Sequence, residues 1–340
     1  FKRQELRQVD GATLGSCGGA VDPSALRVSN RGEGSVPLNP SLRMDKAGPT
    51  ADDGSRQDII VAYTPAAETV MGGWDQIRAE AQLAVDAANL TYANSAITTR
   101  LRLVYTISTS YSESVAWNYE DHLYYLYDPA DGYMDELPPL RDRVGADFLC
   151  LLIDGQDSLG DVYTCGIAPV MQPEDLNDDF APLALSVVSV QCATDNWTLS
   201  HEVGHNRGCA HNRDDASVDG PYSYGYGHRF DGTNGVGYRT VMSYDNANGD
   251  FTRVPHYSHP GIDYAGTPTG VAIGAAGEAH NAQVHANTAA QCAAFRVERT
   301  FVSFGWPHGS TGFLLAPYPD LAQALTGSRD HGAIVLQNSN

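Results

Sequence analysis

The chain of 340 residues is 42% hydrophobic and 18% charged, with a formal net charge of −20. This composition is typical of a soluble globular protein with one large domain and shorter flanking segments. The acidic balance argues against a nucleic-acid partner, which would need a basic face for its phosphate contacts. No stretch is apolar enough to span a membrane, and the N-terminus lacks the apolar core of a signal peptide.

The chain divides by composition into three parts. Residues 1–55 are rich in glycine, serine, proline and charge and show little periodicity, which predicts a pro-segment and linker. The main domain is expected over residues 56–299, and a C-terminal extension over residues 300–340.

Strands and helices alternate in the first half of the main domain. Asp58–Tyr63 is a short apolar run and predicts a strand. Apolar residues then recur at helical spacing over Trp74–Tyr92, and Thr98–Ile107 returns to a strand pattern. This succession predicts a parallel strand pair with a right-handed crossover. Trp117–Tyr133 predicts a helix or a surface excursion, and Gly145–Ile153 is the strongest buried-strand run.

The second half begins with an acidic loop. Glu174–Asp179 offers carboxylates for Ca²⁺, but its spacing matches no defined calcium loop, which favours a solvated loop. Ala184–Val190 predicts another strand, which leads through Cys192 into a histidine-rich segment. Ala279–Arg296 predicts a closing helix.

The histidine-rich segment carries the pattern H-E-x-x-H-x-x-G-x-x-H, with its fixed positions at His201, Glu202, His205, Gly208 and His211. Residues four apart share one helix face, so His201 and His205 can hold one metal ion together. Glycine at 208 lets the helix end and the chain return with His211 as a third ligand. Three histidines and one open position are typical of catalytic zinc, with Glu202 as general base toward water.

Six cysteines allow three disulfides among fifteen connectivities: Cys17, Cys150, Cys165, Cys192, Cys209 and Cys292. Because the zinc motif uses only histidine, disulfides are the expected role for most of them. Disulfides persist in oxidising compartments. We therefore expect a secreted, extracellular monomer whose signal peptide has already been removed.

The zinc motif is followed by Thr240-Val-Met-Ser-Tyr244, and the pair resembles the long zinc motif and Met-turn of metzincin metallopeptidases. Over residues 57–296 the chain resembles the reprolysin-like metzincins, and within these the bacterial secreted peptidyl-Asp metalloendopeptidases. The segments that suggest the bacterial group are Arg239–Tyr244, Tyr257–Pro260 and Ala286–Thr288. The chain departs from reprolysins at Asn212, where they usually have Asp. Tyr244, two residues after the Met, resembles astacins and serralysins.

The resemblance implies an α/β (α+β) metzincin fold. It has a twisted, mostly parallel sheet, a zinc-binding helix, a Met-turn and a small irregular C-terminal subdomain. Met242 would form the apolar floor under the metal. An edge strand including Gly166, Ile167 and Ala168 would pair with an extended peptide substrate. Tyr244 would donate a hydrogen bond to the oxyanion or occupy the zinc, the alternative being a core tyrosine.

The resemblance also bears on three cysteine questions. It implies a Cys192–Cys292 disulfide. Cys150–Cys165 is the second bridge expected, which leaves Cys209 and Cys17 unresolved. Many metzincins are zymogens in which a pro-segment cysteine ligates zinc, and Cys17 lies between glycines that would let backbone approach a cleft. A disulfide at Cys17 and a free thiol are the alternatives.

The C-terminal extension resembles the opening of a right-handed β-helix. Pro317–Leu325 has a Pro-aromatic turn and a Leu/Ala helix, and Gly332–Leu336 is a Gly-led apolar run. One coil cannot bury its own face, so further repeats beyond Asn340 are expected. An ordinary C-terminal tail is the alternative.

The sequence thus predicts a zinc-dependent endopeptidase acting on proteins or peptides. An inert metzincin domain in a secreted binding or adhesion protein is the alternative, which the intact Glu202 disfavours. The peptidyl-Asp resemblance implies cleavage on the amino side of acidic residues, which needs a cationic group beside the site. Arg239 and Arg253 flank the Met-turn and are the candidates, a plain surface role being the alternative for each.

Overall fold

The structure, a computed structural model, describes residues 20–29, 53–155, 164–177, 180–303, 317–319, 323–324 and 333–337. Cys17 lies outside these ranges, so neither interpretation of that residue is tested. Within them, every helix is too short or too polar to cross a membrane.

A six-stranded sheet forms the centre of the molecule. Its spatial order is β1 (Ala20–Val21), β5 (Gly166–Pro169), β6 (Leu185–Ser189), β4 (Phe148–Ile153), β2 (Arg56–Tyr63) and β3 (Arg100–Ser108). Neighbours run parallel except β5 and β6, which are antiparallel. Every residue of β4, β5 and β6 is buried, as expected for strands covered on both faces. The mostly parallel sheet and the predicted β2–helix–β3 unit are confirmed.

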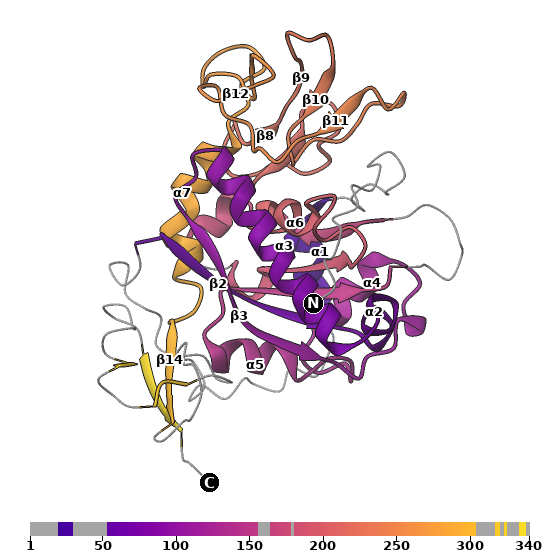
Figure 1. Cartoon of the computed structure of the whole chain (residues 1–340), viewed down its shortest axis with the longest axis vertical. Coiled ribbons are helices and arrows are strands. Elements are labelled where there is room, and N and C mark those ends of the chain that lie inside the picture. Colours follow the sequence, from indigo (N-terminus) through magenta and orange to yellow (C-terminus); the bar gives the residue numbers. More distant parts are fainter. Residues whose placement is uncertain are drawn as a thin grey trace, which may run out of the picture.

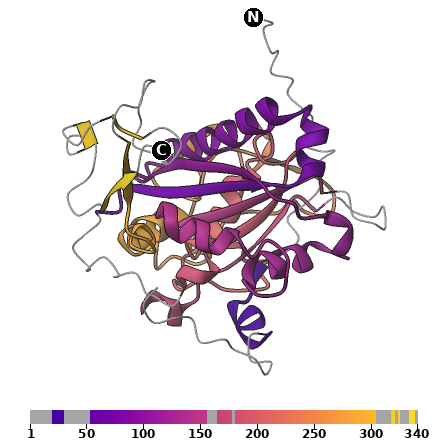
Figure 2. The same ribbon diagram turned by 90° about the horizontal axis from the view of Figure 1, so that it is seen from below.

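The helices cover both faces of this sheet. They are α1 (Pro23–Ser29), α2 (Pro65–Met71), α3 (Trp74–Asn94), α4 (Tyr119–Tyr127), α5 (Leu137–Val144), α6 (Thr198–Asn206) and α7 (Asn281–Ala293). The short 3₁₀ segments are η3 (Glu113–Val115), η4 (Pro173–Asn177) and η5 (Ala181–Leu183). In Figure 2, α3 lies along one side of the sheet and α5 on the other. Helix α3 also packs against α6, so both lie on the same face.

The chain from the end of α6 to β13 forms a small subdomain of short strands, seen at the top of Figure 1. Its strands are β7 (Ala210–Asn212), β8 (Tyr226–Gly227), β9 (Arg229–Asp231), β10 (Gly237–Arg239), β11 (Phe251–Arg253), β12 (Asp263–Tyr264) and β13 (Thr267–Pro268). They pair in twos and threes, and loops make up much of the rest. Helix α6 lies between this subdomain and the central sheet (Figure 1), so the histidine-rich segment faces the junction of the two.

The disulfide differs from both predicted pairings. Cys165 is bonded to Cys192, while Cys150, Cys209 and Cys292 are buried thiols. The cause is the antiparallel β5–β6 pair, because the Ser189 N–H donates to the Cys165 carbonyl and the Ser189 carbonyl accepts from the Cys192 N–H. The predictions of Cys192–Cys292 and Cys150–Cys165 are therefore wrong.

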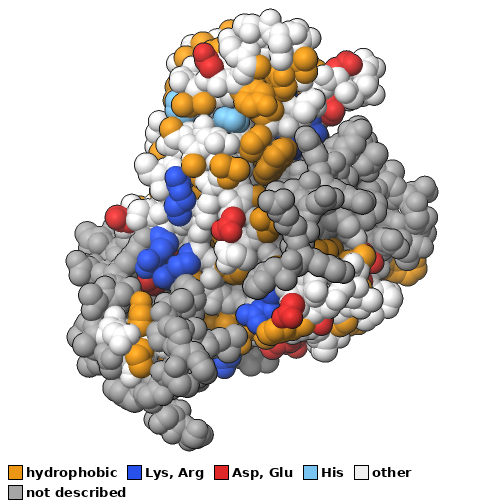
Figure 3. All heavy atoms as spheres, in the orientation of Figure 1, with side chains coloured by type: hydrophobic (Ala, Val, Ile, Leu, Met, Phe, Trp, Pro, Cys, Tyr) orange, Lys and Arg blue, Asp and Glu red, His pale blue; other side chains and the backbone are white. Residues whose placement is uncertain are grey.

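The C-terminal residues contribute β14 (Arg299–Ser303) and β15 (Ala333–Gln337), which pair in parallel. Much of the predicted β-helix coil lies outside the described residues, so it stays a prediction, as do the domain boundaries. The face in Figure 3 carries basic and acidic side chains interspersed with apolar ones. The net charge of −20 is thus not gathered into one acidic surface on that face.

Candidate metal centre

Helix α6 is buried along its whole length, and its end is set by glycine. All nine residues of Thr198–Asn206 are buried. Gly208 has φ +90°, a left-handed conformation that favours glycine, and a Cβ there would lie 2.6 Å from Cδ of Pro221. The Gly208 N–H donates to the His205 carbonyl and closes the last turn. The chain can then return immediately, and β7 carries His211 back beside the helix.

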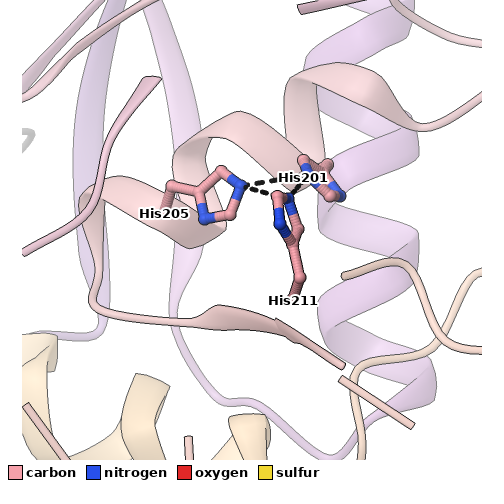
Figure 4. Close-up of side chains that lie close together, drawn as sticks. All are labelled: His201, His205 and His211. Carbon is pink, nitrogen blue, oxygen red and sulfur yellow. Dashed lines mark hydrogen bonds between the residues drawn. The ribbon is translucent and has the colours of Figure 1, made fainter. Parts of the chain in front are cut away.

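Three imidazole rings converge at this return. The Nε2 atoms of His201, His205 and His211 lie 3.0–3.2 Å from one another. Figure 4 shows two of the rings projecting from the helix and the third rising from the returning strand. All three are buried, at 0%, 0% and 1% exposure. The predicted ligand set is therefore brought together.

The hydrogen bonds behind the rings set the protonation of two of them. His201 Nδ1 lies 2.8 Å from the Val241 carbonyl, and His205 Nδ1 lies 2.8 Å from the Cys209 carbonyl. A carbonyl can only accept, so the proton of each neutral ring sits on Nδ1 and its Nε2 presents a lone pair. Burial lowers the pKa of His205 to about 4, which keeps the ring neutral at pH 7.

A zinc ion fits this arrangement. Tetrahedral zinc with Zn–N bonds of about 2.0–2.1 Å would hold ligand nitrogens roughly 3.3 Å apart, close to the separations observed. Burial first, and then the positive charge of neighbouring groups including Arg253, lower the pKa of His201 and His211 well below the ordinary range. Buried neutral imidazoles with converging lone pairs are a donor set for a cation. Among the described residues, no other group of three His, Cys, Asp or Glu side chains is close enough to share an ion.

The Met-turn packs directly under the helix. Met242 is fully buried, and a Cβ on Gly204 would lie 2.6 Å from its Sδ atom. The glycine between the two helical histidines thus lets the thioether approach the helix backbone. The Val241 carbonyl, one residue earlier, is the acceptor of His201 Nδ1. The segment around Met242 therefore packs against α6 and orients the His201 ring through the Val241 carbonyl.

Glu202 faces β5. Its side chain is fully buried, and a Cβ on Gly166 would lie only 2.5 Å from Glu202 Oε1. The missing side chain at the first residue of β5 is what makes room for the carboxylate. Gly166, Ile167 and Ala168 all belong to β5, whose outer side is paired with β1 at Ala168 and Pro169. The predicted substrate strand therefore lies against Glu202, but it is not an edge strand in this structure, because β1 pairs with its outer side and takes the edge position.

Tyr244 lies beside the third histidine and is only partly buried, so it is no core tyrosine. Its ring centroid is 4.0 Å from that of His211. The Tyr244 N–H donates to Oδ1 of Asn212 at 3.0 Å, and Asn212 Nδ2 donates to Asp215. The residue that departs from the reprolysin pattern therefore joins the third ligand to Tyr244.

One positioning residue escaped the sequence analysis. Asn206 Nδ2 donates to the carbonyl of Pro169 at 3.0 Å and to that of Leu185 at 3.1 Å. The last residue of α6 is thereby tied to β5 and to β6. The carbonyls that accept from Asn206 lie far away in the chain. The sequence therefore indicates its role only by placing an amide side chain in a buried helix.

In the described part of the acidic loop, Asp175 has a structural role. Asp175 is fully buried, and its Oδ2 atom accepts from the Gln172 N–H at 2.8 Å. Its backbone carbonyl accepts from Gln291 on α7. Asp175 therefore closes its own turn, and the described residues of this loop bring no three carboxylates close enough together to share an ion.

Comparison with known proteins adds independent evidence. The profile of Metallo-peptidase family M12 matches residues 54–258. A peptidyl-Asp metalloendopeptidase of Stenotrophomonas maltophilia is 35% identical over 238 residues, 70% of this chain and 52% of the relative. One of Xanthomonas campestris is 32% identical over 241 residues, 70% of this chain and 51% of the relative. The chain thus spans about half the length of the curated relatives it matches.

A solved structure described as a chaperone–substrate complex is similar in fold. Its TM-score is 0.52 at 20% identity, over 71% of this chain and 36% of that one. The matched profile covers more than half of this chain and includes the histidine triad and the Met-turn. The chain therefore belongs to the metallopeptidase family M12.

Proposed function

We propose that this protein is a zinc-dependent endopeptidase that hydrolyses peptide bonds with Glu202 as the general base. The observation that carries the proposal is the buried set of three Nε2 atoms within 3.0–3.2 Å, with Glu202 adjacent in the helix and facing β5. The relatives named as metalloendopeptidases support the same activity. Bound at the triad, zinc supplies a Lewis acid that polarises a carbonyl and lowers the pKa of water.

The remaining steps fall to residues of the chain. An extended peptide pairs with the backbone of β5 by main-chain hydrogen bonds, which places a scissile carbonyl beside the triad. Glu202 takes a proton from the attacking water and passes it to the leaving amine. Tyr244, in contact with the His211 ring, donates a hydrogen bond to the oxyanion. The substrate carries an acidic residue on the carboxyl side of the scissile bond, in keeping with the relatives' name of peptidyl-Asp metalloendopeptidase.

Glu202→Ala separates catalysis from metal binding. The variant should keep one zinc per chain, because the three histidines are untouched, and should lose hydrolysis of casein. Casein hydrolysis by the wild-type protein should also stop with a zinc chelator and return with added zinc. Metal-replete Glu202→Ala that still cleaves casein would refute the mechanism. A wild-type protein that binds zinc and cleaves nothing, even without residues 1–55, would favour the inert binding domain.

We also propose that residues 1–55 hold the enzyme latent. Strand β1 pairs in parallel with β5 at Ala168 and Pro169, and the Val170 N–H donates to the Val21 carbonyl at 3.0 Å. Leu26 of α1 is buried at 3% exposure within the apolar core. The segment thus occupies the strand edge that a substrate would use, and Cys17 precedes β1 by three residues.

Latency has a direct test. Activity should rise when residues 1–55 are removed by limited proteolysis of the purified protein. It should rise in Cys17→Ser as well if the thiolate is a zinc ligand. A rise on removal but not in Cys17→Ser would restrict the block to the paired strand. No change in either would refute latency.

The Cys165–Cys192 disulfide supports export of the protein, because such bonds persist in oxidising compartments. We propose on that ground that the enzyme acts outside the cell. The test collects protein from the culture medium and from the cell interior and labels its thiols. Recovery from the medium with Cys165 and Cys192 unlabelled is the expected result, and protein confined to the cell interior would contradict it.

A further inference from the structure

We infer that Arg253, the last residue of β11, is the residue that recognises the acidic side chain beside the scissile bond. The inference rests on the proposed peptidase function and names the specificity determinant of that same site. The alternative candidate, Arg239, has a different role in the structure.

Arg253 lies beside the first half of the zinc-binding helix. It is buried at 8% exposure, and its Nη1 atom donates to the Asn196 carbonyl at 3.0 Å, two residues before α6 begins. Four residues further on, the Tyr257 hydroxyl donates to the Ser200 carbonyl at 2.5 Å. The segment 253–257 therefore runs along the same half of α6 that carries His201. Arg253 is therefore neither at the surface nor solvated.

The positive charge of Arg253 acts on the histidines of the proposed metal site. It is one of the causes that lower the pKa of both His201 and His211. A buried charge is screened by salt much less than a surface charge. The guanidinium therefore presents a positive field beside the position where the peptide bond is cleaved.

Arg239 holds the Met-turn loop. Its Nε atom donates to the Phe251 carbonyl at 3.0 Å and its Nη1 atom donates to the Ser243 carbonyl at 2.7 Å. Its Nε atom also lies 4.0 Å from a carboxylate oxygen of Asp245. Through these contacts Arg239 connects β11 to Ser243, the residue after Met242.

The two arginines also repel each other. Arg239 and Arg253 are direct partners across the parallel β10–β11 pair. Burial, and then the charge of Arg253, lower the pKa of Arg239 to about 9. A carboxylate brought to Arg253 offsets this like-charge repulsion, and a neutral side chain does not. The arrangement thus favours an anion at Arg253.

Guanidinium and carboxylate are matched in geometry as well as in charge. The planar fork of arginine binds a carboxylate with two parallel hydrogen bonds. Asparagine has nearly the same shape as aspartate but carries no charge. A site of this kind should prefer Asp over Asn by about 10- to 100-fold, the range of charge-assisted hydrogen bonds.

The test uses two quenched fluorescent peptides that differ only by Asp or Asn after the scissile bond. The readout is the ratio of kcat/KM values for the two peptides, measured with zinc-loaded enzyme freed of residues 1–55. The ratio cancels any change that affects both peptides alike. Wild type should show a ratio of about 10 to 100, and Arg253→Gln should bring it within about threefold of one. Arg239→Gln is the matched variant at the partner position and should keep the preference.

Arg253→Lys keeps the charge, loses the fork and should give an intermediate ratio. It also serves as the test if Arg253→Gln fails to fold, judged by circular dichroism and zinc content. The inference is overturned by a wild-type ratio near one, by an unchanged ratio in the folded Arg253 variants, or by a loss confined to Arg239→Gln. Each of those results leaves the peptidase function standing. If the wild-type enzyme cleaves neither of the two peptides nor casein, the proposed function itself is overturned.

Discussion

Gly166→Ala is the sharpest probe of the contact between β5 and the proposed base. A Cβ at this position would lie 2.5 Å from Glu202 Oε1 and 2.7 Å from Cγ2 of Thr198. Ordinary contact begins near 3.4 Å, so the carboxylate or the strand must move by about 0.9 Å, the difference between the two distances. The φ of Gly166 is not in the left-handed region, so alanine adds no backbone strain there.

The displacement should act on the chemical step. Misplacing a reacting group by about 1 Å costs roughly 100-fold in rate, or about 2.7 kcal/mol of barrier. Overpacking should also lower the free energy of unfolding by about 1–3 kcal/mol. The zinc ligands do not contact the new methyl group at these short distances, so one zinc per chain should remain.

The assay combines peptide kinetics, zinc analysis and urea unfolding. Gly261→Ala is the matched control, since it is exposed and its Cβ would approach only the ring edge of His259, at 3.2 Å. The control should retain wild-type kcat. A Gly166→Ala enzyme with one zinc and a kcat within about threefold of wild type would show that the carboxylate position is not critical.

Three further predictions concern other parts of the chain. The double variant Cys165→Ala, Cys192→Ala should lose about 3–4 kcal/mol of unfolding free energy, because the disulfide links residues 27 apart; an unchanged urea midpoint would contradict this. Burial lowers the pKa of His122 to about 4, so the unfolded chain binds a proton there that the native chain does not as pH falls below about 6.5. Stability should therefore drop by about 3 kcal/mol between pH 6.5 and 4, and His122→Gln should flatten that dependence in urea titrations. Asn212→Ala removes the acceptor of the Tyr244 N–H and should cost about 1 kcal/mol of stability and lower kcat, whereas Asn212→Asp should restore both; equal kcat in all three proteins would show that this link is dispensable.

The site could be predicted where its geometry is local. His201 and His205 share one face of a helix and His211 follows a glycine turn, so their spacing alone predicted that the three side chains lie together, as they do in the structure. The buried strands β2, β4 and β6 were predicted for a similar reason, because β4 is a continuous apolar run and the other two are mostly apolar. In both cases the information lies within a few neighbouring residues.

Features that depend on distant partners could not be predicted. The Cys165–Cys192 bond follows from the antiparallel pairing of β5 with β6, and no local pattern states that direction. Asn206 positions α6 through carbonyls of Pro169 and Leu185, which only the folded sheet brings near. Helix α5 was missed because its first residue, Leu137, is followed by Pro138 and Pro139, which are tolerated in a first turn but suggest a loop in the sequence.

The pairing of β1 with β5 spans only two residues, Ala20 and Val21. So short a strand has little affinity of its own as a free peptide, and its occupancy comes from the high effective concentration that a continuous chain provides. A cut anywhere between Ser29 and Arg56 would leave every contact of β1 intact and still convert the pairing into a bimolecular one. Release of the segment would then follow dilution. Under the proposed latency, the nicked enzyme would stay blocked while concentrated and become active as it spreads into a larger volume.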